Sequence, residues 1–201
     1  NANHLLARVG AFYHDIGKID DAGMYIENRI TDPRAKELSP TEYSQLIISH
    51  VRKGVELARK FDLPESVIDF IREHHGKSTM TFFYHQALEE ADREDRIDEV
   101  NKSDFQYPGP KPHSRETAIV MLADTIEAAS RSVSEPTKAK LEGMVNKIIF
   151  NKLNEGDLEM ADLTMVELTV IRKSFIKILT GIFHTRIEYP DQADVKKLER
   201  K

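Results

Sequence analysis

The chain has 201 residues, a formal net charge of −5 at pH 7 and no cysteine. This length suits one domain with a substantial hydrophobic core. The acidic balance argues against a surface that coats nucleic acid, so no polymeric nucleic-acid partner is expected. The lack of cysteine excludes thiolate zinc sites, iron–sulfur clusters and cysteine nucleophiles, and leaves nitrogen and oxygen ligands for any metal. No apolar run approaches the roughly 20 residues that span a bilayer.

Helical periodicity dominates the chain, and no useful length alternates with the period of two that strands show. The first predicted helix covers residues 4–16 and ends at Gly17, which we expect in the left-handed conformation. A loop-rich segment follows, and the next predicted helix covers residues 41–61. Pro64 opens the third helix, and Gly76 closes it.

The second half of the chain is also predicted to be helical. The expected helices run from about residue 81 into the acidic run at 89–99, from the N-cap Ser114 to about residue 132, near 137–155 and near 165–186. The segment 101–113 holds three prolines and is expected to be irregular. The sequence thus predicts an all-α fold, with one domain over residues 1–188 and a charged tail over residues 189–201.

Histidine and aspartate recur on successive predicted helices, in the order His-Asp, His, His-His and Asp. These residues are His14, Asp15, His50, His74, His75 and Asp124. Imidazole nitrogens and carboxylate oxygens are ligands that iron, manganese and zinc accept in hydrolytic sites. Four imidazoles and two carboxylates exceed what one tetrahedral ion needs. They suit two ions that share a bridging carboxylate, the arrangement that splits phosphate esters.

The spacing of these residues constrains the site. Neighbouring helix residues point about 100° apart, so His14 and Asp15 can converge only on a site beyond the helix end. Asp15 can bind one ion with each oxygen and is therefore the predicted bridge. Taken singly, each residue also has a structural explanation: a His-His pair can complement a helix dipole, and His50 can be an interior histidine. Asp124 follows an apolar run, however, and a buried carboxylate needs a partner such as a metal.

Five segments carry a resemblance to a known family: residues 13–18 (YHDIGK), 48–51 (ISHV), 70–76 (FIREHHG), 107–112 (YPGPKP) and 121–124 (MLAD). With these segments the chain resembles the HD superfamily of metal-dependent phosphohydrolases. More narrowly, it is similar to the cytoplasmic HD domain of the seven-transmembrane-receptor HD proteins, the PgpH-type cyclic-di-AMP phosphodiesterases. The resemblance extends from about residue 3 to the final helix.

The resemblance implies a helical HD bundle, two divalent metal ions (iron or manganese), and hydrolysis of cyclic di-AMP to pApA. Carried over by position, one metal is bound by His14 and Asp124, the other by His50, His74 and His75, and both by Asp15. A related family that cleaves cyclic di-GMP has a GYP signature shortly after its His-His pair. This chain lacks that signature, which favours the adenine nucleotide.

The chain also departs from the family. The family has a further histidine on a helix well before the His-Asp pair, and this chain begins too late to include it. His4 is no substitute, because ten residues of helix place it about 15 Å from His14. The resemblance further implies that the full-length protein is tethered to the membrane, with this segment at its cytoplasmic face. The oligomeric state is not predicted.

The expected mechanism is attack on phosphorus by a hydroxide held between the two metals. Asp15 and Lys18 are the predicted catalytic residues, and Lys18 is also a candidate phosphate contact. Arg115 and Arg131 are candidate phosphate contacts or simply surface cations. Two alternatives stay open: a single-metal HD phosphohydrolase that acts on dNTPs or ppGpp, and a nucleotide-sensing domain that binds without cutting.

Overall fold

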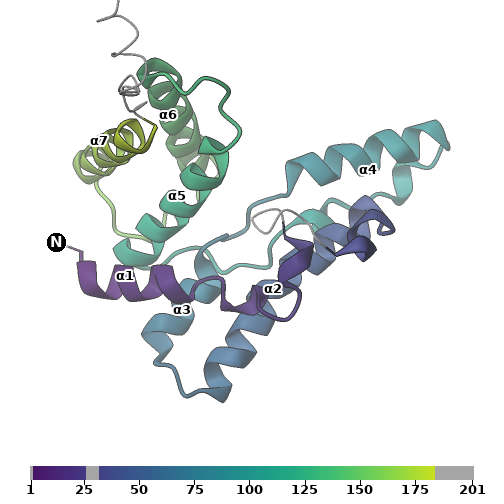
Figure 1. The fold of residues 1–201 in the computed structure, drawn as a ribbon, viewed down its shortest axis with the longest axis horizontal. Coiled ribbons are helices and arrows are strands. Elements are labelled where there is room, and N and C mark those ends of the chain that lie inside the picture. Colours follow the sequence, from purple (N-terminus) through teal and green to yellow (C-terminus); the bar gives the residue numbers. More distant parts are fainter. Residues whose placement is uncertain (1, 26–31, 184–201) are drawn as a thin grey trace, which may run out of the picture.

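The computed structural model describes residues 2–25 and 32–183, and the regular structure in these ranges is helical (Figure 1). The α-helices are α1 (His4–Tyr13), α2 (Pro40–Lys60), α3 (Glu65–Glu73), α4 (Thr81–Arg93), α5 (Arg115–Ser130), α6 (Lys138–Asn154) and α7 (Met165–Ile182). Short 3-10 turns lie at Ile16–Lys18 (η1), Ala22–Met24 (η2), Pro33–Lys36 (η4), Ile97–Glu99 (η5) and Lys102–Phe105 (η6). The predicted all-α fold is confirmed. Within the described ranges, every helix is too short or too polar to cross a bilayer.

The helices form two groups, and α1 packs against both (Figure 1). Helices α5, α6 and α7 enclose one apolar core, in which Met121 and Leu141 are fully buried. A second core lies between α2 and α3 and contains Ile68 and Ile71. Because α1 contacts α3 and α5, its C-terminal end lies where the two groups meet.

The first helix ends earlier than predicted, and its glycine has a different role. Helix α1 stops at Tyr13, and the chain continues into η1. The prediction that Gly17 is left-handed is wrong, because the positive-φ glycines of the described residues are at other positions. Gly17 is needed instead for a close approach of two backbones. A Cβ atom at this position would lie 1.9 Å from the carbonyl oxygen of His50 and 2.5 Å from the amide nitrogen of Gly54.

Other predicted boundaries are confirmed by their capping contacts. Ser114 precedes α5, and its side chain accepts a hydrogen bond of 3.1 Å from the amide of Thr117. Gly76 adopts a φ of +53° in the turn that follows α3. The last residues of the helix predicted at 165–186 and the tail predicted at 189–201 lie outside the described residues. The domain boundary at residue 188 therefore stays a prediction.

The helix predicted to enter the acidic run is shorter than expected. Helix α4 ends at Arg93, because Asp95 adopts a left-handed φ of 57°. The amide of Arg96 then donates to the carbonyl of Ala91, which completes the helix end. Residues 101–113 contain the turn η6 and are otherwise irregular, as their prolines predicted.

The contact at Gly17 generates the first prediction. Gly17→Ala should destabilise the fold by about 1–3 kcal/mol, because the added methyl group meets backbone atoms of α2 that cannot rotate away. Urea unfolding followed by circular dichroism measures this change. Gly143→Ala is the matched control: a Cβ at Gly143 in α6 meets nothing within 4 Å, so this variant should be slightly more stable than the parent. A Gly17→Ala protein as stable as the parent would show that the backbones of η1 and α2 are not in close contact.

Candidate metal centre

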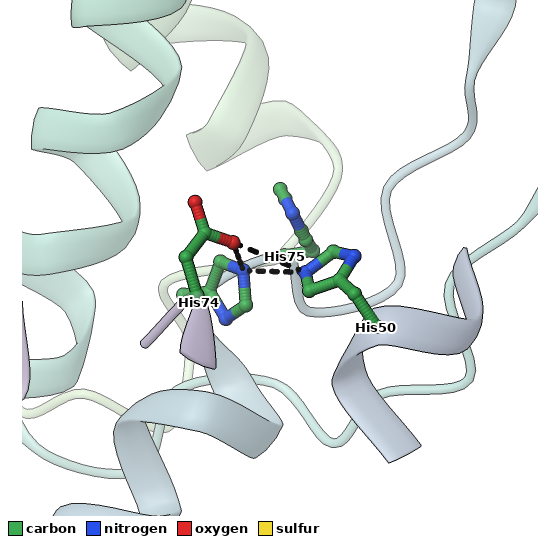
Figure 2. A group of neighbouring side chains, drawn as sticks. His50, His74 and His75 are labelled. Atoms are coloured by element: carbon green, nitrogen blue, oxygen red, sulfur yellow. Dashed lines mark hydrogen bonds and ion pairs between the residues drawn. The ribbon is translucent and has the colours of Figure 1, made fainter. Parts of the chain in front are cut away.

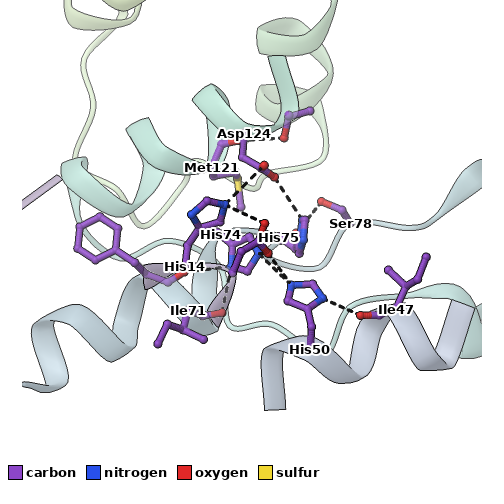
Figure 3. Close-up of polar contacts among 12 residues, drawn as sticks. His14, Ile47, His50, Ile71, His74, His75, Ser78, Met121 and Asp124 are labelled. Carbon is purple, nitrogen blue, oxygen red and sulfur yellow. Dashed lines mark hydrogen bonds and ion pairs between the residues drawn. The ribbon is translucent and has the colours of Figure 1, made fainter. Parts of the chain in front are cut away.

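The six candidate ligands selected from the sequence converge on one place (Figure 3). His14 follows the last residue of α1, and Asp15 precedes η1. His50 projects from the middle of α2, where the chain contacts Gly17. The remaining three side chains come from the end of α3 and the middle of α5, namely His74, His75 and Asp124.

One group of donor atoms comprises a carboxylate and three imidazoles, with all ligand atoms within 4.8 Å of one another. Asp15 Oδ1 lies 3.4 Å from His50 Nε2 and 3.6 Å from His74 Nε2. Figure 2 shows the rings of His50, His74 and His75 close to one another. His50 and His74 are fully buried. The group has the nitrogen-rich composition that divalent iron, manganese and zinc accept.

A second group contains His14, Asp15 and Asp124. His14 Nε2 lies 3.3 Å from Asp15 Oδ2 and 3.7 Å from Asp124 Oδ1. Lys18 Nζ is also 2.8 Å from Asp15 Oδ2. Asp15 is therefore common to both groups, with one carboxylate oxygen turned to each. This is the geometry that a bridging carboxylate needs.

The imidazole tautomers follow from hydrogen bonds to backbone carbonyls. The Nδ1 atom of His14 lies 2.9 Å from a carbonyl oxygen, that of His50 lies 2.6 Å from one, and that of His74 lies 3.0 Å and 3.1 Å from two. A carbonyl can only accept, so each Nδ1 carries the proton and donates. In neutral rings the Nε2 atoms, which point into the centre, are then bare acceptors.

Two observations indicate that this centre is shaped for cations. His50 Nε2 and His74 Nε2 face each other at 3.1 Å, although both are acceptors, and a positive charge beside them would relieve their repulsion. His14 Nε2 and Asp15 Oδ1 are buried and make no hydrogen bond. Buried polar atoms without a hydrogen bond are rare, and metal coordination would satisfy both. The residues present therefore fit a metal centre.

The electrostatics of the two groups differ. Burial by itself would lower the pKa of His14, but contacts with two neighbouring carboxylates outweigh burial and raise that pKa to about 10. Burial opposes ionisation of Asp15, yet contact with the His14 imidazolium holds the pKa of that carboxyl far below its usual range. Burial, together with neighbouring positive charge, lowers the pKa of His74 to about 3. Burial also lowers the pKa values of His50 and His75. These three imidazoles are neutral near pH 7, the form that binds metals.

A cavity of about 860 Å³ opens beside the centre, and its wall includes His75 and Asp124. Four lysines also line it: Lys77, Lys102, Lys111 and Lys152. A cavity of this size can bury a drug-sized ligand, and its lysines would favour an anionic one. Sequence reasoning did not select these lysines, although two of them lie in or beside the segments that carry the family resemblance.

The two arginines proposed as phosphate contacts do not line this cavity. Arg115 Nη2 lies 3.1 Å from Asp162 Oδ2, and its Nη1 lies 3.0 Å from Glu167 Oε1. Arg131 Nε lies 2.8 Å from Glu127 Oε1 on the same helix. Phosphate binding by either arginine stays a prediction, and the described contacts do not support it.

Two further features hold the centre, and sequence reasoning missed both. The Tyr107 ring stacks on the His75 ring, with centroids 4.0 Å apart and planes inclined by 23°. Buried Glu73 accepts hydrogen bonds from the backbone amide of His113 at 3.1 Å and from its Nδ1 at 2.6 Å. Asp69 lies beside this pair, and these three side chains form a third group of potential metal ligands. Their mutual bonds fasten the 107–113 loop to the end of α3 and explain the group without a metal.

Comparisons with known proteins identify the family of this chain. The HD domain family profile matches residues 1–129. The cyclic-di-AMP phosphodiesterases PgpH of Bacillus subtilis and Listeria monocytogenes are 44% and 38% identical to this chain over 94% and 96% of its length. The chain spans about a quarter of these relatives, 26% of each. The crystal structure of the L. monocytogenes PgpH HD domain in complex with cyclic-di-AMP is similar in fold, with a TM-score of 0.83 and 38% identity, over 94% of this chain and 84% of that one. The chain belongs to the HD domain family.

Proposed function

We propose that this chain is a metal-dependent phosphodiesterase domain that hydrolyses cyclic di-AMP to pApA. The observation that carries the proposal is the position of Asp15, whose two oxygens face two separate groups of donors. A single-metal phosphohydrolase would need only one such group. The named activity of the PgpH relatives and the cyclic-di-AMP complex of the similar structure support the choice of substrate.

We assign six ligands to two divalent ions, iron or manganese. His14 and Asp124 would hold one ion, His50, His74 and His75 would hold the other, and Asp15 would contribute to both sites. Such a pair of ions supplies an activated water and positive charge beside the phosphodiester. The backbone bonds at Nδ1 fix the rings of His14, His50 and His74, so their Nε2 atoms need no reorientation to bind.

The chain's own cations complete the proposed chemistry. Lys18 neutralises Asp15 on one side and can donate a hydrogen bond to a phosphate oxygen at the same place. The cavity lysines Lys77 and Lys102 offer positive charge to the second phosphate. Hydrolysis adds water across one P–O3′ bond: oxygen joins phosphorus, the P–O3′ bond breaks, and a proton goes to O3′. Cleavage of one of the two diesters gives linear pApA.

The similarity to PgpH proteins also supports a proposal about the whole protein. We infer that the full-length protein is tethered to a membrane and holds this domain at the cytoplasmic face. The substrate would then be the small-molecule nucleotide of that compartment, not a polymeric nucleic acid.

The decisive test combines metal content and product. Metal-free chain loaded with Mn²⁺ should bind two ions and convert cyclic di-AMP to pApA, and a chelator should abolish turnover because the ions supply the activated water. Equilibrium dialysis measures the stoichiometry, and chromatography identifies the product. Cyclic di-GMP, a dNTP and ppGpp are incubated in parallel. One ion with dNTP or ppGpp hydrolysis would support the single-metal alternative, whereas binding of cyclic di-AMP without pApA would support a sensor.

Replacing the bridging carboxylate provides a second prediction. Asp15→Ala should lower the metal content below two ions per chain. It should reduce kcat by more than about 100-fold, the upper end of the loss seen when only an outer partner of a ligand is removed. Asp20→Ala removes an exposed carboxylate from the same loop and is the matched control. An Asp15→Ala protein that retains two ions and full turnover would exclude the bridged centre.

A further inference from the structure

A buried lysine lines the same cavity as His75. Lys152 belongs to α6, and its side chain is 8% exposed. Its Nζ atom lies 2.7 Å from Asp157 Oδ2 and 2.5 Å from Ser78 Oγ. The amide of Asp157 also donates to the carbonyl of Lys152 at 3.0 Å, which fixes the two residues relative to each other. A buried ammonium is tolerated where it is paired and hydrogen-bonded, and Lys152 meets both conditions.

The direction of the hydrogen bonds from Lys152 is determined by chemistry. An ammonium group has donors only, so Ser78 Oγ must accept from it. The single hydroxyl proton of Ser78 is then free to donate to the carbonyl of His75, which lies 2.6 Å away. The same carbonyl also accepts from the Ser78 amide at 3.1 Å. A series of hydrogen bonds therefore runs from Asp157 through Lys152 and Ser78 to the backbone of a candidate metal ligand. Figure 3 shows the last part of this series, with Ser78 beside His75.

The turn at residues 75–78, where these hydrogen bonds end, has little room to move. Gly76 adopts a φ of +53°, and a Cβ atom there would lie 2.8 Å from Met121 Cε and 3.3 Å from Asp157 Oδ1. On its other side, the Tyr107 amide donates to the carbonyl of Ser78 at 3.0 Å, while the Tyr107 ring stacks on His75. The His75 turn is thus held between the 107–113 loop and the Lys152–Asp157 pair.

We propose that Lys152 is a positioning residue for His75, acting through Ser78 to hold the turn that presents this imidazole to the metal centre. Asp157 acts by holding Lys152. Ligands that are fixed before binding lose less entropy on coordination. Removal of the hydrogen bonds from Lys152 through Ser78 should therefore weaken metal binding without direct loss of a ligand. This inference rests on the proposed function, since it takes His75 as a metal ligand.

The test uses Mn²⁺ alone as the probe, with isothermal titration calorimetry on the metal-free chain. Ser78→Ala removes the hydroxyl and leaves the Lys152–Asp157 pair intact, so the fold should persist. We expect one of the two Mn²⁺ ions to bind about tenfold more weakly, within the range for partners that orient a ligand. Ser78→Thr keeps the hydroxyl and should restore the parental affinity. Ser130→Ala is the matched control, since Ser130 Oγ donates to the carbonyl of Glu127 at 2.7 Å in a different part of the fold.

A second variant removes the buried ion pair as a whole. Lys152→Met with Asp157→Leu replaces both charges by apolar side chains of similar size, which avoids leaving one charge unpaired. This double variant should weaken Mn²⁺ binding as much as Ser78→Ala does. The triple variant should lose no more Mn²⁺ affinity than either, because all three residues act through one series of hydrogen bonds. The melting temperature of each metal-free variant separates this effect from general destabilisation.

The outcomes separate this inference from the function on which it rests. If the parent binds two Mn²⁺ ions and every variant binds them equally well, the positioning role is overturned and the proposed function stands. Unchanged Mn²⁺ affinity with a raised KM for cyclic di-AMP would make Lys152 a substrate contact and would also overturn the role. A parent chain that binds no Mn²⁺ would overturn the proposed function, and the positioning role with it.

Discussion

The contact between the backbones of η1 and α2 is the constraint on which the site depends. Gly17 allows the turn after α1 to reach the carbonyl of His50, and this contact sets the distance between Asp15 and the His50 ring. Asp15 precedes η1 and His50 lies on α2, so neither element could create the site alone. A side chain at position 17 would push η1 away from α2 and separate the carboxylate from the imidazoles. The candidate centre is therefore a consequence of packing at one glycine.

The six candidate ligands could be selected from the sequence, whereas most of the contacts that hold them in place could not. The candidate ligands, including His14 and Asp15, are residue types that bind metals, and they recur on successive helices. This pattern can be recognised without knowing how the helices pack. The caps at Ser114 and Gly76 were predictable because capping is local in sequence. The left-handed conformation predicted for Gly17 is wrong, because the close approach of another helix leaves no local signal in the sequence.

Long-range contacts account for the remaining differences. Lys152 and Ser78 are 74 positions apart, and Glu73 and His113 are 40 apart, so no periodicity connects them. Arg115 also makes contacts that its position in the sequence did not reveal. Its place at the start of α5 suggested a phosphate contact, but its guanidinium bonds to Asp162 and Glu167 near the start of α7. A residue's spacing from a ligand along one helix does not reveal which neighbouring element its long side chain will reach.

The overall charge and the local charge of this chain have opposite signs, and the difference bears on how an anion is recognised. A net charge of −5 gives no general attraction for a nucleotide, and salt screens such fields beyond about 8–10 Å. The attraction must act inside the cavity, where Lys77 and Lys102 lie on its wall and Lys18 lies beside Asp15. Lys152 adds little to this attraction, because Asp157 already neutralises it. Under the proposed function, its charge would stabilise the His75 turn, and the exposed lysines would be left to contact the phosphates.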